Sequence, residues 1–136
     1  MKILQINSVC GITSTGRIAA DICREAQKQG HFCMVAYGEV TYPNRPTELM
    51  TYEMGGRLNC ISHAAWTRIT DRHGLWSKKA TRKLIQEIEK YQPDIIHLHN
   101  LHGYYLNYQI LFQYLKAKDI KVFWTLHDCW AFTGHC

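Results

Sequence analysis

His127 and Asp128 are the most distinctive pair of titratable residues in the sequence, because they directly follow the apolar segment KVFWTL. This segment predicts a strand over Lys121 to Leu126, so the pair is expected at a strand's carboxyl end. In parallel sheets such positions border the crevice where ligands bind, and a neutral imidazole there can hydrogen-bond a ligand hydroxyl. The alternative is structural: Asp128 caps the loop and His127 packs into the core.

A second polar group comes from the segment DIIHLHN, in which His97 and His99 alternate along a predicted strand. Residues two apart on a strand lie on the same face. With Asn100 and His102 they resemble a metal cluster, but carboxylates are lacking nearby. We favour a polar lining of the crevice, with His99 and Asn100 at the strand end contacting ligand.

The loop from Cys10 to Gly16 joins a predicted strand to a predicted helix, so its backbone N–H groups favour an anion. Its two glycines have P-loop spacing, but Arg17-Ile18 replaces the required Lys-Ser/Thr, and G-x-G-x-x-G is absent. We select Thr15, Gly16 and Arg17 as candidate substrate-binding residues. The alternative is a tight turn in which Thr15 or Ser14 is the helix N-cap.

Periodicity predicts the elements that position these residues. We expect strands at Lys2 to Val9, Phe32 to Tyr37, Asp94 to Leu98 and Lys121 to Leu126. Helices are expected from Arg17 to Gly30, around Leu58 to Ile69, around Leu84 to Tyr91, and at Asn107 to Lys118, with a loop at Gly38 to Pro46.

Strands separated by helices are typical of βαβ units with right-handed crossovers. The sequence therefore predicts an α/β fold: a Rossmann-like, three-layer domain with a mostly parallel sheet. The length of 136 residues and 46% hydrophobic content suit one globular domain. The apolar run at the amino terminus is too short for a signal peptide, and no apolar run has the roughly 20 residues that a membrane span needs. We therefore expect a cytosolic protein.

Six cysteines are present, but without an export signal we expect thiols rather than disulfides. Cys10, Cys23, Cys33 and Cys60 fall in apolar patterns and are predicted to be buried. The tail from Cys129 to Cys136 also contains His135, which makes a Cys/His metal module an alternative. Its cysteine spacing matches no common zinc motif, so we predict free thiols.

The net charge of +5 is moderate, and we expect no nucleic-acid partner. Seven basic residues cluster in a stretch that also holds Trp66 and Trp76 and one acidic residue, Asp71. The basic residues are Arg57, Arg68, Arg72, Lys78, Lys79, Arg82 and Lys83. Such a stretch is either a solvated helical face or a peripheral contact with an anionic membrane or a pyrophosphate-linked lipid.

Four segments together resemble the amino-terminal domain of bacterial family 4 glycosyltransferases, of the colanic acid and capsule type. They are KILQINSV with the Gly16 loop, Ser77 to Ile85 after Asp71-Arg72-His73-Gly74, PDIIHLHN and VFWTLHDCWAFTGHC. The last is the most specific. Many members have paired glycines where this chain has Thr15-Gly16.

The resemblance implies the amino-terminal, acceptor-side half of a two-domain GT-B enzyme, with the nucleotide-sugar domain beyond Cys136. It implies retaining transfer of a sugar from a nucleotide sugar to a growing, often lipid-linked, glycan without a metal or other cofactor, and the chain has no D-x-D motif. By this resemblance Gly16 lies near donor phosphates and acceptor, and His127, followed by Asp128, contacts the transferred sugar. A non-catalytic Rossmann-like binding module is the alternative.

Overall fold

The computed structural model describes residues 1–38, 48–71 and 74–133. This part of the chain forms alternating strands and helices. In chain order they are β1 (Lys2–Asn7), α1 (Thr13–Lys28), β2 (Phe32–Tyr37), β3 (Met50–Glu53), α2 (Gly56–Thr70), α3 (Lys78–Tyr91), β4 (Ile95–Leu98), α4 (Tyr108–Lys116), β5 (Lys121–Trp124) and α5 (Trp130–Thr133).

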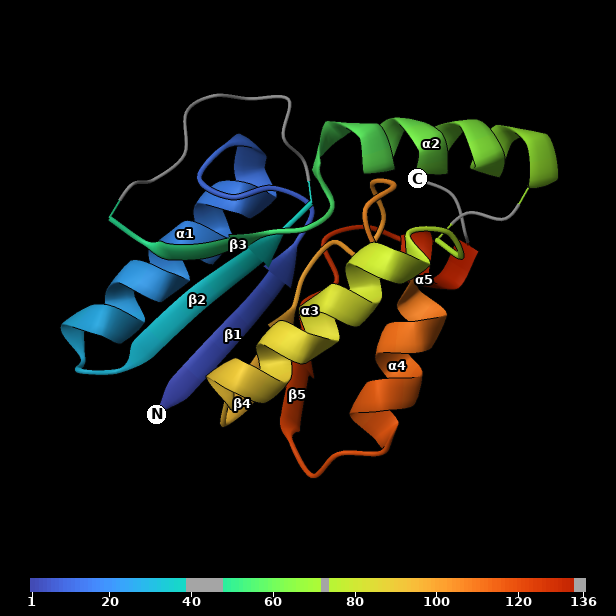
Figure 1. The fold of residues 1–136 in the computed structure, drawn as a ribbon. Coiled ribbons are helices and arrows are strands. Elements are labelled where there is room, and N and C mark those ends of the chain that lie inside the picture. Colours follow the sequence, from blue (N-terminus) through green and yellow to red (C-terminus); the bar gives the residue numbers. More distant parts are fainter. Residues whose placement is uncertain (39–47, 72–73, 134–136) are drawn as a thin grey trace.

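The strands form a single sheet in the order β3-β2-β1-β4-β5, and all four pairings are parallel. β1 is the central strand, with Gln5 opposite Val35 of β2 and opposite His97 of β4. Because every strand runs the same way, all carboxyl ends lie at one edge of the sheet (Figure 1). This arrangement confirms the predicted α/β, Rossmann-like fold.

Helices cover both faces of the sheet and create two cores (Figure 1). On one face, α1 places its small side chains, such as Ala19 and Cys23, against Val35 of β2. On the other face, α3 and α4 bury larger residues, including Leu84 and Leu111, against Leu4 and Ile96. The small residues of α1 allow the helix to approach the sheet closely. Its first turn lies near the carboxyl edge because α1 follows the end of β1 after a short loop.

The structure differs from the sequence prediction mainly at short elements. Strand β3 and the four-residue helix α5 were not predicted, because four residues are too few to show a period. Helix α1 begins at Thr13, four residues before the predicted start, in a Gly/Ser/Thr segment that resembles a loop. The predicted loop after β2 falls largely on residues 39–47, outside the described part.

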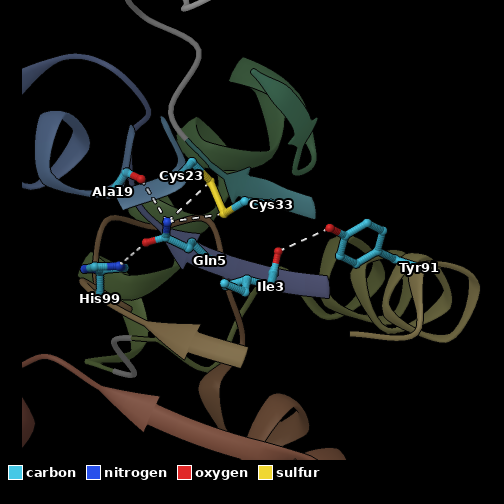
Figure 2. Close-up of a disulfide and its surroundings, with 7 residues drawn as sticks. All are labelled: Ile3, Gln5, Ala19, Cys23, Cys33, Tyr91 and His99. Carbon is cyan, nitrogen blue, oxygen red and sulfur yellow. Dashed lines mark hydrogen bonds between the residues drawn. A yellow bond between two sulfur atoms is a disulfide. The ribbon is translucent and has the colours of Figure 1, made fainter. Parts of the chain in front are cut away.

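The prediction that Cys23 and Cys33 are free thiols is wrong, since a disulfide joins them between α1 and β2 (Figure 2). The helix packs on the strand so closely that the two Cα atoms are 5.3 Å apart. Sequence patterns show burial but not this proximity. Cys10 is a buried thiol, as predicted, and burial raises its pKa to about 11. Cys60 is only half-buried, Cys129 is exposed, and Cys136 is outside the described residues.

Gly38, the residue directly after β2, gives a test of the packing between the sheet and the segment that carries Tyr105. A Cβ added there lies 2.0 Å from the Cβ of the fully buried Tyr105, so Gly38→Ala forces the two segments apart. We expect it to lower the free energy of unfolding by about 3 kcal/mol in urea titrations.

The matched control is Gly30→Ala, where nothing lies within 4 Å of the added Cβ and only the positive φ of 78° opposes the change. This variant is expected to lose about 1 kcal/mol. Equal losses for the two variants would contradict the packing described around Tyr105.

Candidate active site

A small pocket opens at the carboxyl edge of the sheet, between the loops that follow β4 and β5. Its lining contains four of the candidate residues: His99, Asn100, His127 and Asp128. Its volume of about 10 Å³ accommodates roughly one water molecule. The parallel register of β4 and β5 brings these residues together, although 28 positions separate His99 from His127 in the sequence.

His127 is held by a hydrogen bond to His99, which in turn is held by Gln5. The Nε2 of His127 is 2.9 Å from Nδ1 of His99, and Nε2 of His99 is 2.7 Å from Oε1 of Gln5. Gln5 is fully buried, and His99 is 1% exposed. Both ring nitrogens of His99 are therefore used within the protein, which leaves neither of them for the direct ligand contact that the sequence predicts.

The environment keeps the neighbouring histidines neutral. Burial, together with the nearby His97 and His127 rings, lowers the pKa of His99 to about 3. Burial and the proximity of His127 also lower the pKa of His97, whose Nε2 is 2.8 Å from the hydroxyl oxygen of Thr125. As predicted, the His97 and His99 side chains lie on the same face of the sheet, with ring centroids 4.2 Å apart.

Asp128 has structural partners for both carboxylate oxygens. Its Oδ1 accepts from the backbone N–H of Trp130 at 2.9 Å, and its Oδ2 is 2.7 Å from Nε2 of His102. Burial alone opposes ionisation, but the hydrogen bonds from His102 and Trp130 outweigh it and the pKa of Asp128 is lowered. The carboxylate thus fixes the start of α5 and the loop after β4, as the structural alternative for Asp128 predicts.

The Asn7 side chain connects the two predicted ligand loops. Its Oδ1 accepts from the backbone N–H of Asn100 at 3.2 Å, while its Nδ2 donates to the carbonyl of Val9 and lies 3.5 Å from Oγ1 of Thr15. Asn7 is fully buried. It therefore ties the β4 loop to the first turn of α1, so that Thr15 and Asn100 belong to one hydrogen-bonded assembly.

The first turn of α1 has no side-chain cap. Its N-cap residue is Ile12, so the prediction that Ser14 or Thr15 is the N-cap is wrong. The loop does close as a turn, in which the backbone N–H of Gly11 donates to the carbonyl of Gly16 at 2.9 Å. Gly16 is buried, and a Cβ added to it lies 2.9 Å from Cγ2 of Val9. Arg17 is exposed beside it. Uncapped N–H groups at a helix start suit an anion, but none of these residues lines the pocket of His127.

Sequence reasoning did not select Gln5, Asn7 or His102 as site residues. Gln5 and Asn7 had a detectable signal, because they are polar residues within the otherwise apolar strand KILQIN. A buried amide needs partners, and at the end of a central strand those partners come from neighbouring loops. For His102 the signal was weaker, since its partner Asp128 lies 26 residues away.

No three His, Cys, Asp or Glu side chains within the described residues are arranged as metal ligands. His135 and Cys136, on which the metal-module alternative depends, lie outside them.

The lowered pKa of His99 predicts acid-sensitive stability. Because the folded state binds the proton less readily than the unfolded state, its contribution is complete above the unfolded pKa of about 6.5 and is lost as pH falls toward 3. At about pH 5 we expect a loss of about 2 kcal/mol from His99 alone, measured by urea unfolding. His99→Phe should reduce the loss between about pH 7 and pH 5, and an unchanged pH dependence would argue against a neutral buried His99.

Comparison with known proteins adds independent information. The family model described as Glycosyltransferase Family 4 matches residues 15–135. The chain is also 28% identical over 149 aligned residues to WcaC of Escherichia coli (strain K12), whose name assigns it to colanic acid biosynthesis as a glycosyl transferase. That alignment covers all of this chain but 35% of the relative, so the chain spans about a third of that protein's length. Since the family model matches most of the chain, the chain belongs to glycosyltransferase family 4.

Proposed function

We propose that the full-length protein is a glycosyltransferase that moves a sugar from a nucleotide sugar to a growing, lipid-linked cell-surface polysaccharide, with retention and without a metal cofactor. The observation that carries this proposal is the position of His127: within a family 4 domain, it lines the pocket at the carboxyl edge of a parallel sheet. In such sheets this edge is where ligands bind.

In this proposal the described domain supplies the acceptor side of a GT-B active site. His127 hydrogen-bonds a hydroxyl of the transferred sugar, and Asp128 holds the loop that carries His127 through its bonds to His102 and Trp130. The uncapped first turn of α1, with Thr15, Gly16 and Arg17, provides N–H groups for donor phosphate or acceptor. A carboxy-terminal domain of the same protein binds the nucleotide.

The chemical role of this domain is positioning and electrostatic stabilisation. Positive charge developing on the transferred sugar is stabilised by donor phosphate and by fixed dipoles rather than by a protein cation. Neutral His97 and His99 fit this role, because their lowered pKa values keep additional positive charge away from the sugar.

The test of this role is His127→Ala in the full-length protein. We expect turnover to fall at least about tenfold without unfolding, because one directed hydrogen bond in the transition state is lost. Turnover is measured as nucleoside diphosphate release from a panel of nucleotide sugars with membrane-extracted acceptor. His31→Ala, remote in sequence from the pocket, is the control, and wild-type turnover in His127→Ala would refute the assignment.

We also propose a peripheral contact with the inner face of the cytoplasmic membrane, through helix α2. Leu58, Ile61 and Ile69 share one face of α2 and are 83%, 55% and 73% exposed. Arg57 and Arg68 border that face, and no helix in the described part is long and apolar enough to cross a bilayer. An exposed apolar face bordered by arginines suits an anionic lipid surface.

The basic stretch that motivated this proposal lies on two helices rather than one. Lys78, Lys79, Arg82 and Lys83 lie on α3, while Trp66 of α2 stacks on Trp76 with ring centroids 5.3 Å apart. Arg72 lies outside the described residues. The apolar face of α2 is therefore the feature on which we base the membrane contact.

Vesicle co-sedimentation tests the membrane contact. The full-length protein should bind vesicles containing phosphatidylglycerol, less at high salt, and Leu58→Ser/Ile69→Ser should bind about tenfold more weakly because apolar insertion is lost. Phe32→Ser removes a similarly exposed apolar side chain, 65% exposed, at the start of β2 and is the control. Equal binding by both variants would show that α2 does not contact lipid.

A further inference from the structure

The orientation of the Gln5 amide can be assigned from its neighbours (Figure 2). Its Nε2 is 2.9 Å from the carbonyl oxygen of Ala19, which only accepts hydrogen bonds. The same nitrogen lies 3.3 Å and 3.6 Å from the sulfurs of Cys23 and Cys33. The amide nitrogen therefore faces α1, and Oε1 faces His99.

This orientation fixes the tautomer of His99. The Oε1 of Gln5 is an acceptor, so Nε2 of His99 at 2.7 Å carries a proton. Burial keeps His99 neutral and lowers its pKa to about 3. A neutral imidazole has one N–H group, and so Nδ1 of His99 is an acceptor.

His127 is the donor to that acceptor. Its Nε2 lies 2.9 Å from Nδ1 of His99, and the rings are tilted by 17° with centroids 5.2 Å apart. This separation is about the N–N distance plus the two ring radii, so the rings meet edge to edge in nearly one plane. The Nε2 proton of His127 therefore points along the lone pair of His99.

We propose that Gln5 and His99 are positioning residues that hold His127 as its Nε2–H tautomer, so that Nδ1 accepts a hydrogen bond from a ligand hydroxyl. We call this chain of hydrogen bonds the relay: it runs from the carbonyl of Ala19 in α1 through Gln5 and His99 to His127 in the loop after β5. The identity of the ligand as a sugar rests on the proposed function; the tautomer of His127 does not. The hydroxyl then acts as donor, and a ligand with an acceptor alone at that position is disfavoured.

Nitrogen NMR of the histidine rings tests the relay directly. In full-length protein labelled with 15N-histidine at about pH 8, the His127 ring should show a pyrrole-type Nε2 and a pyridine-type Nδ1. His99 should show the same pattern, and the signals are assigned by their loss in His127→Gln and His99→Gln. A His127 that is predominantly Nδ1–H, or an even mixture, would overturn the proposal.

Gln5→Leu separates positioning from a merely structural role. The substitution removes the acceptor for the Nε2–H group of His99. His99 can then adopt its Nδ1–H tautomer and donate to Nε2 of His127. The NMR pattern of His127 should therefore shift toward the Nδ1–H tautomer. Thr81→Val, a comparably buried polar change whose hydroxyl contacts Asn107, is the control and should leave the pattern unchanged. An unchanged pattern in folded Gln5→Leu, or an equal shift in both variants, would refute the relay. Wild-type turnover in His127→Ala would instead contradict the proposed function.

Discussion

The parallel pairing of β1 with β4 is the constraint on which the candidate site depends. It sets Gln5 of β1 opposite His97 of β4. At the next residue of β1, the carbonyl of Ile6 accepts a hydrogen bond from the backbone N–H of His99. Gln5, His97 and the His99 ring consequently gather on one side of the sheet, where α1 closes over Gln5. The β4–β5 ladder then brings the loop after β5, with His127, to the same pocket.

Most of the fold was predictable from the sequence, because the buried strands form short apolar runs and the amphipathic helices show a helical period of apolar residues. The segment FCMVAY gave β2 with its observed bounds, and the stripe of Ile18, Ile22 and Ala26 indicated α1. The features that were not predicted depend on which segments lie close together in the folded chain. MTYE is too short to show that it joins the sheet beside β2, and no local pattern reveals that Cys23 and Cys33 lie within bonding distance.

The site was predictable in its position but not in its internal chemistry. Strand ends identified His99, Asn100, His127 and Asp128, and the structure brings them to one pocket. The partners that hold them, however, lie far away along the chain: Gln5 is 94 residues from His99, and His102 is 26 residues from Asp128. The alternative of a core histidine is wrong for His127, which is only half-buried. The loop-capping role of Asp128 is compatible with the ligand contact proposed for His127, because a histidine that positions a ligand must itself be held, and here the holding groups, Gln5 and His99, are buried and neutral.

The most direct test of the account is an experimental structure of the full-length protein with a bound nucleotide sugar. The account predicts that a hydroxyl of the transferred sugar lies within hydrogen-bonding distance of Nδ1 of His127, with Nε2 still bonded to His99. A sugar bound away from the carboxyl edge of this sheet, or one that contacts His127 only after the His99 bond has broken, would contradict it.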